Sequence, residues 1–92
     1  MNAKRKGTRN EHRSKAVLEA AGFNVTRAAG SLGTWDLVAV SATEVCLVQV
    51  KTRDWPGAAE IERLRAFPAP ALCRKVLHRW RHRRRSPDVE EL

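Results

Sequence analysis

Two short apolar segments near the middle of the chain constrain the fold more than any other feature. Residues 35–40 and 45–50 consist almost entirely of apolar residues that favour β-strands, and the polar run 41–44 separates them. Strand-forming segments of this length on either side of a short polar turn predict a β-hairpin. Because neither segment alternates strictly between apolar and polar residues, we expect both faces of the hairpin to be buried.

The turn decides which residues of this hairpin lie opposite each other. If Val40 pairs with Val45, the pairing continues away from the turn and places Asp36 opposite Gln49. Side chains alternate between the two faces of a strand, so Lys51 shares a face with Gln49. The polar side chains in the bodies of the two strands therefore gather at the open end of the hairpin.

A helix is predicted before the hairpin, because both of its ends carry recognisable signals. Thr8 and Glu11 have the spacing of a capping box, which predicts a helix that begins near Arg9. Gly22 follows the last apolar residues at helical spacing and is expected to end the helix. Residues 23–27 then alternate between apolar and polar and predict a half-buried strand.

The segments after the hairpin complete a small α/β domain. A short helix is predicted over 58–67, where Pro68 stops it. Residues 72–80 fit a strand or a helix, and the preceding prolines favour a strand; 89–92 form a last short strand or a tail. Since 92 residues support one core, we expect a single domain over 1–92, with a mixed sheet around the hairpin and the first helix on one face.

The net charge of +8 is concentrated at the two ends of the chain. Residues 1–15, which include a basic arm over 1–8, hold six basic residues and one acidic residue, and the Arg-rich segment 74–85 holds seven basic residues and no acid. Arginine binds phosphate through paired hydrogen bonds, so this distribution favours a polyanion such as nucleic acid. A basic surface that serves only solubility is the alternative.

Several classes of protein lack support in the sequence. No apolar run is long enough to cross a bilayer and no signal peptide is visible, so we expect the protein inside the cell, of cellular or phage origin. Cys46 and Cys73 lack metal-site spacing and are expected to be reduced, buried thiols. No phosphate-binding loop of a nucleotide site is present. We expect His12, His78 and His82 to lie at the surface or to contact phosphate.

The polar end of the hairpin suits metal-dependent hydrolysis of a phosphodiester. Magnesium prefers carboxylate and carbonyl oxygens, which Asp36, the Gln49 side chain and the Val50 backbone can supply. Lys51 would then face the attacking water or the charge that develops in the transition state. The alternative is an ordinary ion pair between Asp36 and Lys51 of little energetic consequence.

Five segments resemble, in order and spacing, the archaeal-type Holliday junction resolvases of the PD-(D/E)xK nuclease superfamily. They read KGTRNE at 6–11, GFNVTR at 22–27, AGS at 29–31, TWDLVA at 34–39 and VQVK at 48–51. The resemblance covers about residues 4–53 and fades over the carboxyl-terminal part. It implies a restriction-endonuclease-like core with helices packed on a mixed sheet.

The resemblance also implies a role for each site residue. Glu11 would be the acid of the helix, Asp36 the central metal ligand, Gln49 the hairpin ligand and Lys51 the catalytic lysine, while Ser31 would lie near the scissile phosphate. The family usually has Glu where Gln49 stands, although a Q-x-K version occurs among related nucleases. Glu11 has a second interpretation, because the capping box alone would explain it.

The function that follows from the resemblance is Mg²⁺-dependent resolution of four-way DNA junctions by a homodimer, with Mn²⁺ as a substitute ion. The expected metal ligands are Glu11, Asp36, Gln49 and Val50. The expected DNA contacts are Lys4, Arg5, Lys6, Arg9, Arg13, Ser31 and Arg53. Two alternatives stay open: a nicking or linear-duplex nuclease of the same fold, and a DNA-binding module whose site Gln49 has inactivated.

Overall fold

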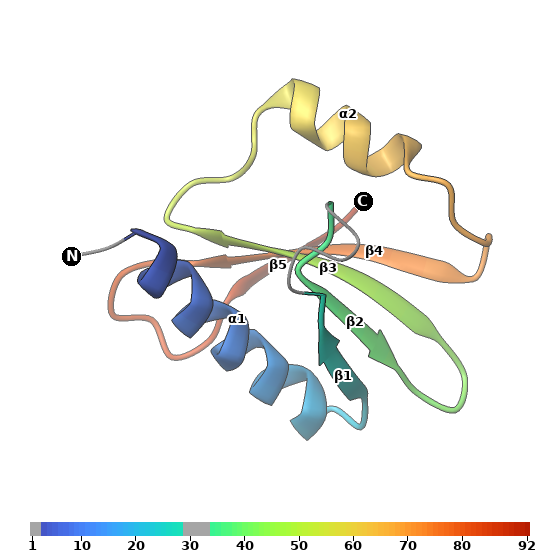
Figure 1. The fold of residues 1–92 in the computed structure, drawn as a ribbon, viewed down its shortest axis with the longest axis horizontal. Helices are drawn as coiled ribbons and strands as arrows, with labels where there is room; N and C mark the ends of the chain where they lie inside the picture. Colours follow the sequence, from blue (N-terminus) through green and yellow to red (C-terminus); the bar gives the residue numbers. More distant parts are fainter. Residues whose placement is uncertain (1–2, 29–33) are drawn as a thin grey trace.

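The structure is a five-stranded mixed sheet with one helix on each face (Figure 1). This computed structural model describes the backbone of residues 3–28 and 34–92, and the side chains from residue 7 onward within those ranges. The elements are α1 (Ala3–Ala20), β1 (Asn24–Arg27), β2 (Leu37–Val40), β3 (Val45–Thr52), α2 (Ala58–Ala66), β4 (Cys73–Trp80) and β5 (Asp88–Glu91). The α/β prediction is confirmed.

The strands lie in the sheet in the order of the sequence, β1 to β5. All neighbours are antiparallel except β3 and β4, which are parallel and are joined by α2. In the hairpin Val40 pairs with Val45 and Leu37 with Val48, so the predicted register is confirmed. The sequence of residues 72–80 was compatible with a strand or a helix, and in the structure Cys73–Trp80 forms strand β4 beside β3.

Helix α1 begins earlier than the capping box predicts. It starts at Ala3, so Thr8 lies inside the helix and cannot be its N-cap. The prediction was wrong because alanine, lysine and arginine before Thr8 are good helix formers. The basic arm is therefore helical from Ala3 onward.

The carboxyl-terminal end of α1 agrees with the sequence prediction. Gly22 has φ of +101°, a conformation that favours glycine. Its N–H donates to the Glu19 carbonyl at 3.0 Å, and the Phe23 N–H donates to the Leu18 carbonyl at 3.1 Å. These two bonds form a Schellman motif, which turns the chain into β1.

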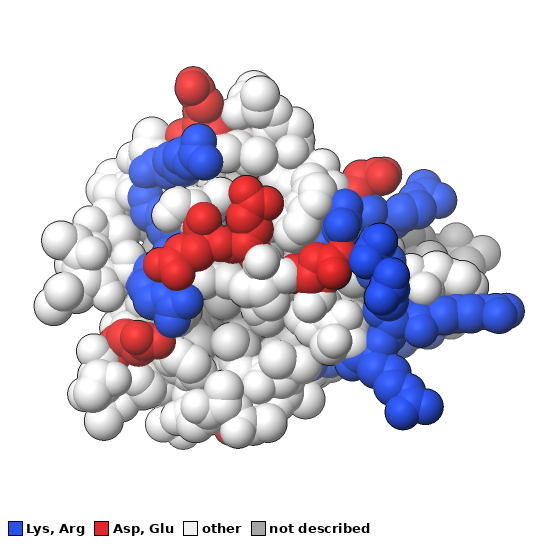
Figure 2. Space-filling model, turned by 180° about the vertical axis from the view of Figure 1, so that it is seen from behind, with Lys and Arg blue, Asp and Glu red and all other residues white. Residues whose placement is uncertain are grey.

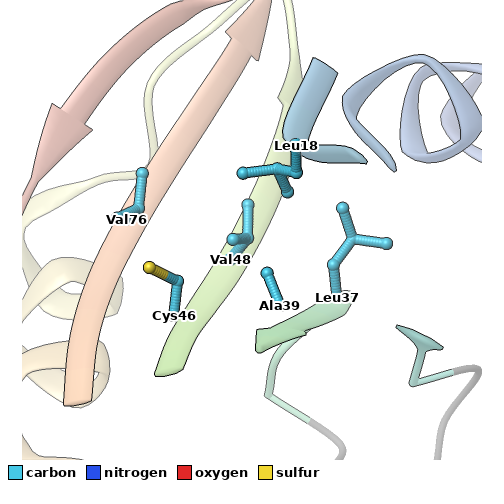
Figure 3. Packing of buried hydrophobic residues seen from close by; sticks show 6 residues of the cluster. All are labelled: Leu18, Leu37, Ala39, Cys46, Val48 and Val76. Atoms are coloured by element: carbon cyan, nitrogen blue, oxygen red, sulfur yellow. The ribbon is translucent and has the colours of Figure 1, made fainter. Parts of the chain in front are cut away.

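Both faces of the sheet are buried, as the apolar hairpin predicted. On the α1 side, Leu18 packs against Leu37, Ala39, Cys46, Val48 and Val76 (Figure 3). On the α2 side, Leu64 packs with Trp35, Leu47 and Leu77. The two helices therefore cover opposite faces of the sheet (Figure 1). Neither helix in the described part of the chain could cross a membrane.

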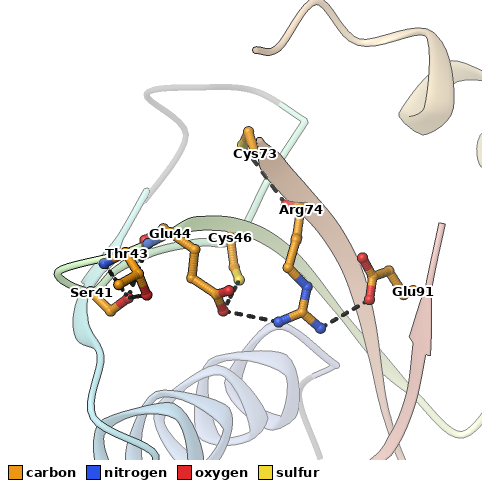
Figure 4. Close-up of polar contacts among 7 residues, drawn as sticks. All are labelled: Ser41, Thr43, Glu44, Cys46, Cys73, Arg74 and Glu91. Carbon is orange, nitrogen blue, oxygen red and sulfur yellow. Dashed lines mark hydrogen bonds and ion pairs between the residues drawn. The ribbon is translucent and has the colours of Figure 1, made fainter. Parts of the chain in front are cut away.

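Polar contacts tie the hairpin turn to the last two strands (Figure 4). The Arg74 guanidinium bonds to Glu44 and to Glu91, each at 2.9 Å. Cys46 and Cys73 are both free thiols, as expected, and Cys46 is buried. Cys73 is only half-buried, so that part of the prediction was wrong; it opens strand β4 beside the exposed Leu72.

Candidate active site

Asp36 is tied to the backbone of the neighbouring strand. It precedes β2, and its N–H donates to the Val48 carbonyl at 3.0 Å. Its Oδ2 accepts the Val50 N–H at 2.8 Å, so the carboxylate reaches β3 between Gln49 and Lys51. Burial raises the pKa of Asp36, and the Val50 N–H bond partly opposes that shift.

Gln49 and Lys51 both contact Glu60, a residue that no sequence motif identified. Lys51 Nζ lies 2.9 Å from Glu60 Oε2, and Gln49 Nε2 donates to the same oxygen at 3.4 Å. Glu60 belongs to the first turn of α2. The sequence could have pointed to Glu60 through its place in that turn. A short loop after β3 brings the start of the next helix close to the end of the strand.

A cavity of about 200 Å³ adjoins this cluster. Its walls are Thr34, Gln49, Glu60, Arg63 and Leu64. The Gln49 Oε1 atom is buried and has no hydrogen-bond partner within the described part of the chain. A buried acceptor without a partner costs free energy, so it is available to a ligand that supplies positive charge or a proton.

Glu11 faces the sheet and makes no cap. Its carboxylate pairs with Arg27 of β1 at 2.9 Å, which rules out the capping-box interpretation. It lies near enough to Asp36 to contribute, by charge repulsion, to the raised pKa of that carboxyl. Glu60 contributes in the same way, while the Lys51 ammonium lowers the pKa. Glu11, Asp36, Lys51 and Glu60 thus form one electrostatic cluster.

The predicted metal ligands are only partly assembled. Among residues 7–28 and 34–92, no three His, Cys, Asp or Glu side chains gather closely enough to hold a metal ion. The oxygen donors near Asp36 nevertheless fit magnesium, because a carboxylate and the unpartnered Gln49 Oε1 are the ligand types that it prefers. Ser31 lies outside the described residues.

A second cavity, of about 210 Å³, forms where α1 meets the ends of β3 and β4. We call it the arginine cavity; its walls are Arg9, Asn10, Arg13, Thr52, Arg53, Trp80, Arg81, His82 and Arg83. No acidic residue is among them. It joins three of the predicted DNA contacts, Arg9, Arg13 and Arg53, to the Arg-rich segment. Figure 2 shows lysine and arginine side chains gathered along one edge of the molecule.

Specific contacts build the walls of the arginine cavity. Asn10 Nδ2 donates to Thr52 Oγ1 at 2.7 Å, and the Arg13 guanidinium stacks 3.9 Å from the centre of the Trp80 ring. Arg53 and Arg83 have φ of +75° and +62°, the only positive values among the described non-glycine residues. Such backbone conformations cost free energy and often occur at functional sites.

The family model for archaeal Holliday junction resolvases matches residues 2–64. The chain belongs to this family. The matched residues include Glu11, Asp36, Gln49, Lys51 and also Glu60, whereas β4, β5 and the Arg-rich segment lie beyond the match.

Comparison of structures supports the same family. The chain is similar to Hjc of Archaeoglobus fulgidus, described as a Holliday junction resolvase from an archaeal hyperthermophile, with a TM-score of 0.69 and 26% sequence identity. The match covers 83% of this chain and 68% of that chain. It supports the restriction-endonuclease-like fold expected for the family. A search of curated proteins finds no match.

Proposed function

We propose that this chain is an endonuclease that resolves four-way DNA junctions by hydrolysing paired phosphodiester bonds with the help of Mg²⁺. Membership of the archaeal Holliday junction resolvase family supports the activity and the substrate. The observation that carries the chemistry is the Asp36 carboxylate, which is held against β3 between Gln49 and Lys51. This arrangement places an acid, a neutral oxygen and an ammonium at one end of the sheet.

Each residue of the site has a proposed task. Asp36, the Gln49 side-chain oxygen and the Val50 carbonyl would hold the ion, and Mn²⁺ would be accepted in place of Mg²⁺. The bound ion would supply positive charge to the scissile phosphate. Lys51 would orient the attacking water and stabilise the charge that develops in the transition state. Glu11 would add a further acid from α1, and Ser31 would approach the scissile phosphate.

The basic surface is proposed to bind the DNA backbone without reading bases. The contacts are Lys4, Arg5, Lys6, Arg9, Arg13 and Arg53, and the arginine cavity adds Arg81 and Arg83. Support comes from the absence of acidic residues in the walls of that cavity and from its arginines, which bind phosphate well.

A four-way junction has two-fold symmetry, and its resolution requires two cuts. We therefore propose a homodimer that brings one site to each cut strand. Because the substrate is DNA, the protein would act in the cell interior.

The test compares a labelled immobile four-way junction with a linear duplex of matched sequence, each with and without Mg²⁺. We expect paired, symmetric nicks in the junction only when Mg²⁺ is present. Asp36→Asn should abolish cleavage while junction binding persists, whereas Glu62→Gln, which makes the same change from carboxylate to amide at an exposed position of α2, should cut normally.

Other outcomes would replace this proposal. Equal cutting of the duplex would indicate a nuclease without junction selectivity. Tight binding without any product would indicate a DNA-binding module, and the neutral Gln49 is the observation that favours that second candidate.

A further inference from the structure

We propose that Glu60, on α2, is a catalytic residue whose carboxylate binds the same divalent ion as Asp36 and supplies the negative charge that Gln49 lacks. The inference rests on the proposed metal-dependent hydrolysis. It goes beyond that proposal because it adds a ligand from α2, whereas the other proposed ligands come from α1 and the hairpin.

The first argument is geometric. The Glu60 carboxylate lies 2.9 Å from Lys51 Nζ and 3.4 Å from Gln49 Nε2. It therefore already contacts two of the proposed site residues. Gln49 and Glu60 also line the same cavity of about 200 Å³, where an ion and its water ligands can be accommodated.

The second argument is the buried Oε1 atom of Gln49. Its amide nitrogen is bonded to Glu60, while Oε1 is buried with no hydrogen-bond partner in the described part of the chain. An ion held by Glu60 at this place would satisfy that oxygen. The neutral amide would then be a ligand beside a carboxylate, and its lack of charge would not prevent binding.

The third argument is the charge of the cluster. Arg27 neutralises Glu11 through an ion pair at 2.9 Å. Asp36 and Lys51 carry opposite charges and Gln49 carries none, so these residues together present no net charge to a cation. Glu60 adds the carboxylate that the walls of the cavity otherwise lack, and Arg63 in the same walls carries the opposite charge, so Glu60 contributes an anionic ligand and no net negative charge.

The position of Glu60 has a local explanation that predicts a different result. Acidic residues are favourable in the first turn of a helix, and Glu60 pairs with Lys51 as an ordinary ion pair would. If that were its whole role, removal of its charge would leave the affinity for metal unchanged.

The experiment is calorimetric titration of the full chain with Mn²⁺ and with Mg²⁺. Glu60→Gln keeps the size of the side chain and removes its charge, and we expect it to weaken metal affinity at least about tenfold and to reduce junction cleavage in parallel. Glu62→Gln makes the same change at an exposed position of the same helix and should leave metal affinity at the wild-type value.

A second variant moves the carboxylate from α2 to the hairpin. Gln49→Glu combined with Glu60→Gln should restore metal affinity and cleavage, because the anion returns to the same ion from β3. Thermal unfolding without metal should be similar for all variants, which separates the loss of a ligand from the loss of the fold.

The outcomes distinguish the two proposals. A Glu60→Gln protein that binds Mn²⁺ as tightly as the wild type overturns the role of Glu60, while the wild type still cuts junctions with Mg²⁺. A wild-type chain that binds neither ion and cuts nothing overturns the proposed function and, with it, the role of Glu60.

Discussion

At the residue scale, one buried hydroxyl group organises the contact between α1 and β4. The Trp80 indole N–H can only donate, so Ser14 Oγ accepts it at 2.7 Å. The Ser14 hydroxyl proton is then left for His78 Nδ1, which lies 3.0 Å away. His78 is buried, so the expectation of a surface or phosphate-contacting histidine was wrong at this position. Strand β4 turns it toward α1.

Removal of this hydroxyl should destabilise the fold. In Ser14→Ala the Trp80 indole and the His78 ring would each lose a partner in a buried site, which costs about 1–3 kcal/mol of the free energy of unfolding. Urea denaturation measures the change. Ser86→Ala, at an exposed position, is the matched control and should have little effect. A loss below about 0.5 kcal/mol in Ser14→Ala would contradict this network.

His78 should also make stability depend on pH. Burial lowers its pKa from 6.5 to about 4, so between these values the unfolded chain binds a proton that the folded chain does not. Stability therefore falls as the pH drops from 6.5 to 4, by about 3 kcal/mol for this group. Urea titrations across this range should show a shallower fall in His78→Gln, which retains an acceptor for Ser14. An equal slope in both proteins would exclude His78 as the cause.

At the element scale, two glycines, one within α1 and one just after its end, have opposite backbone requirements. Gly22 ends the helix with φ of +101°, where any side chain is strained. Gly7 lies within the helix, and a Cβ placed there would meet nothing within 4 Å. The same substitution should therefore have opposite effects at the two positions.

Replacement of each glycine by alanine tests this directly. Gly22→Ala should lower the free energy of unfolding by about 1 kcal/mol or more, because it strains the Schellman motif. Gly7→Ala should raise it by about 0.5–1 kcal/mol, because alanine favours helix. Thermal unfolding of the two proteins measures both effects. Destabilisation by Gly7→Ala would contradict a helix that runs through residue 7.

At the scale of the whole molecule, the arginine cavity gathers residues from α1, the end of β3 and the loop after β4. The family match ends at residue 64, so Arg81 and Arg83 were assigned no role by it. Their position beside Arg9, Arg13 and Arg53 extends the proposed DNA surface to the loop after β4. A phosphate in this cavity would be contacted by both ends of the chain.

Salt dependence tests whether this surface binds phosphate. Arg83→Gln should weaken junction binding and reduce the slope of log affinity against log salt by about one, because roughly one counterion is released per phosphate contact. Arg65→Gln removes the same charge from the exposed side of α2 and should leave the slope unchanged. Fluorescence anisotropy without Mg²⁺ provides both measurements. Identical slopes for the two variants would exclude Arg83 from the DNA interface.

The elements whose formation depends on neighbouring residues were predictable from the sequence. The hairpin register and the helix end at Gly22 follow from turn chemistry and periodicity, which act over a few positions. The start of α1 was not, because a capping-box pattern can occur inside a helix whose preceding residues also favour helix.

The sequence by itself therefore determined the two strands of the hairpin and their register, which leaves polar residues at its open end beside Asp36. Only the tertiary structure decided which charged side chains pair. Glu11 of α1 pairs with Arg27 of β1, and Glu60 of α2 pairs with Lys51 of β3. The physical reason is the distance along the chain over which each kind of interaction acts. Backbone preferences are local, whereas an ion pair or a buried hydrogen bond requires that two distant elements pack at the correct distance.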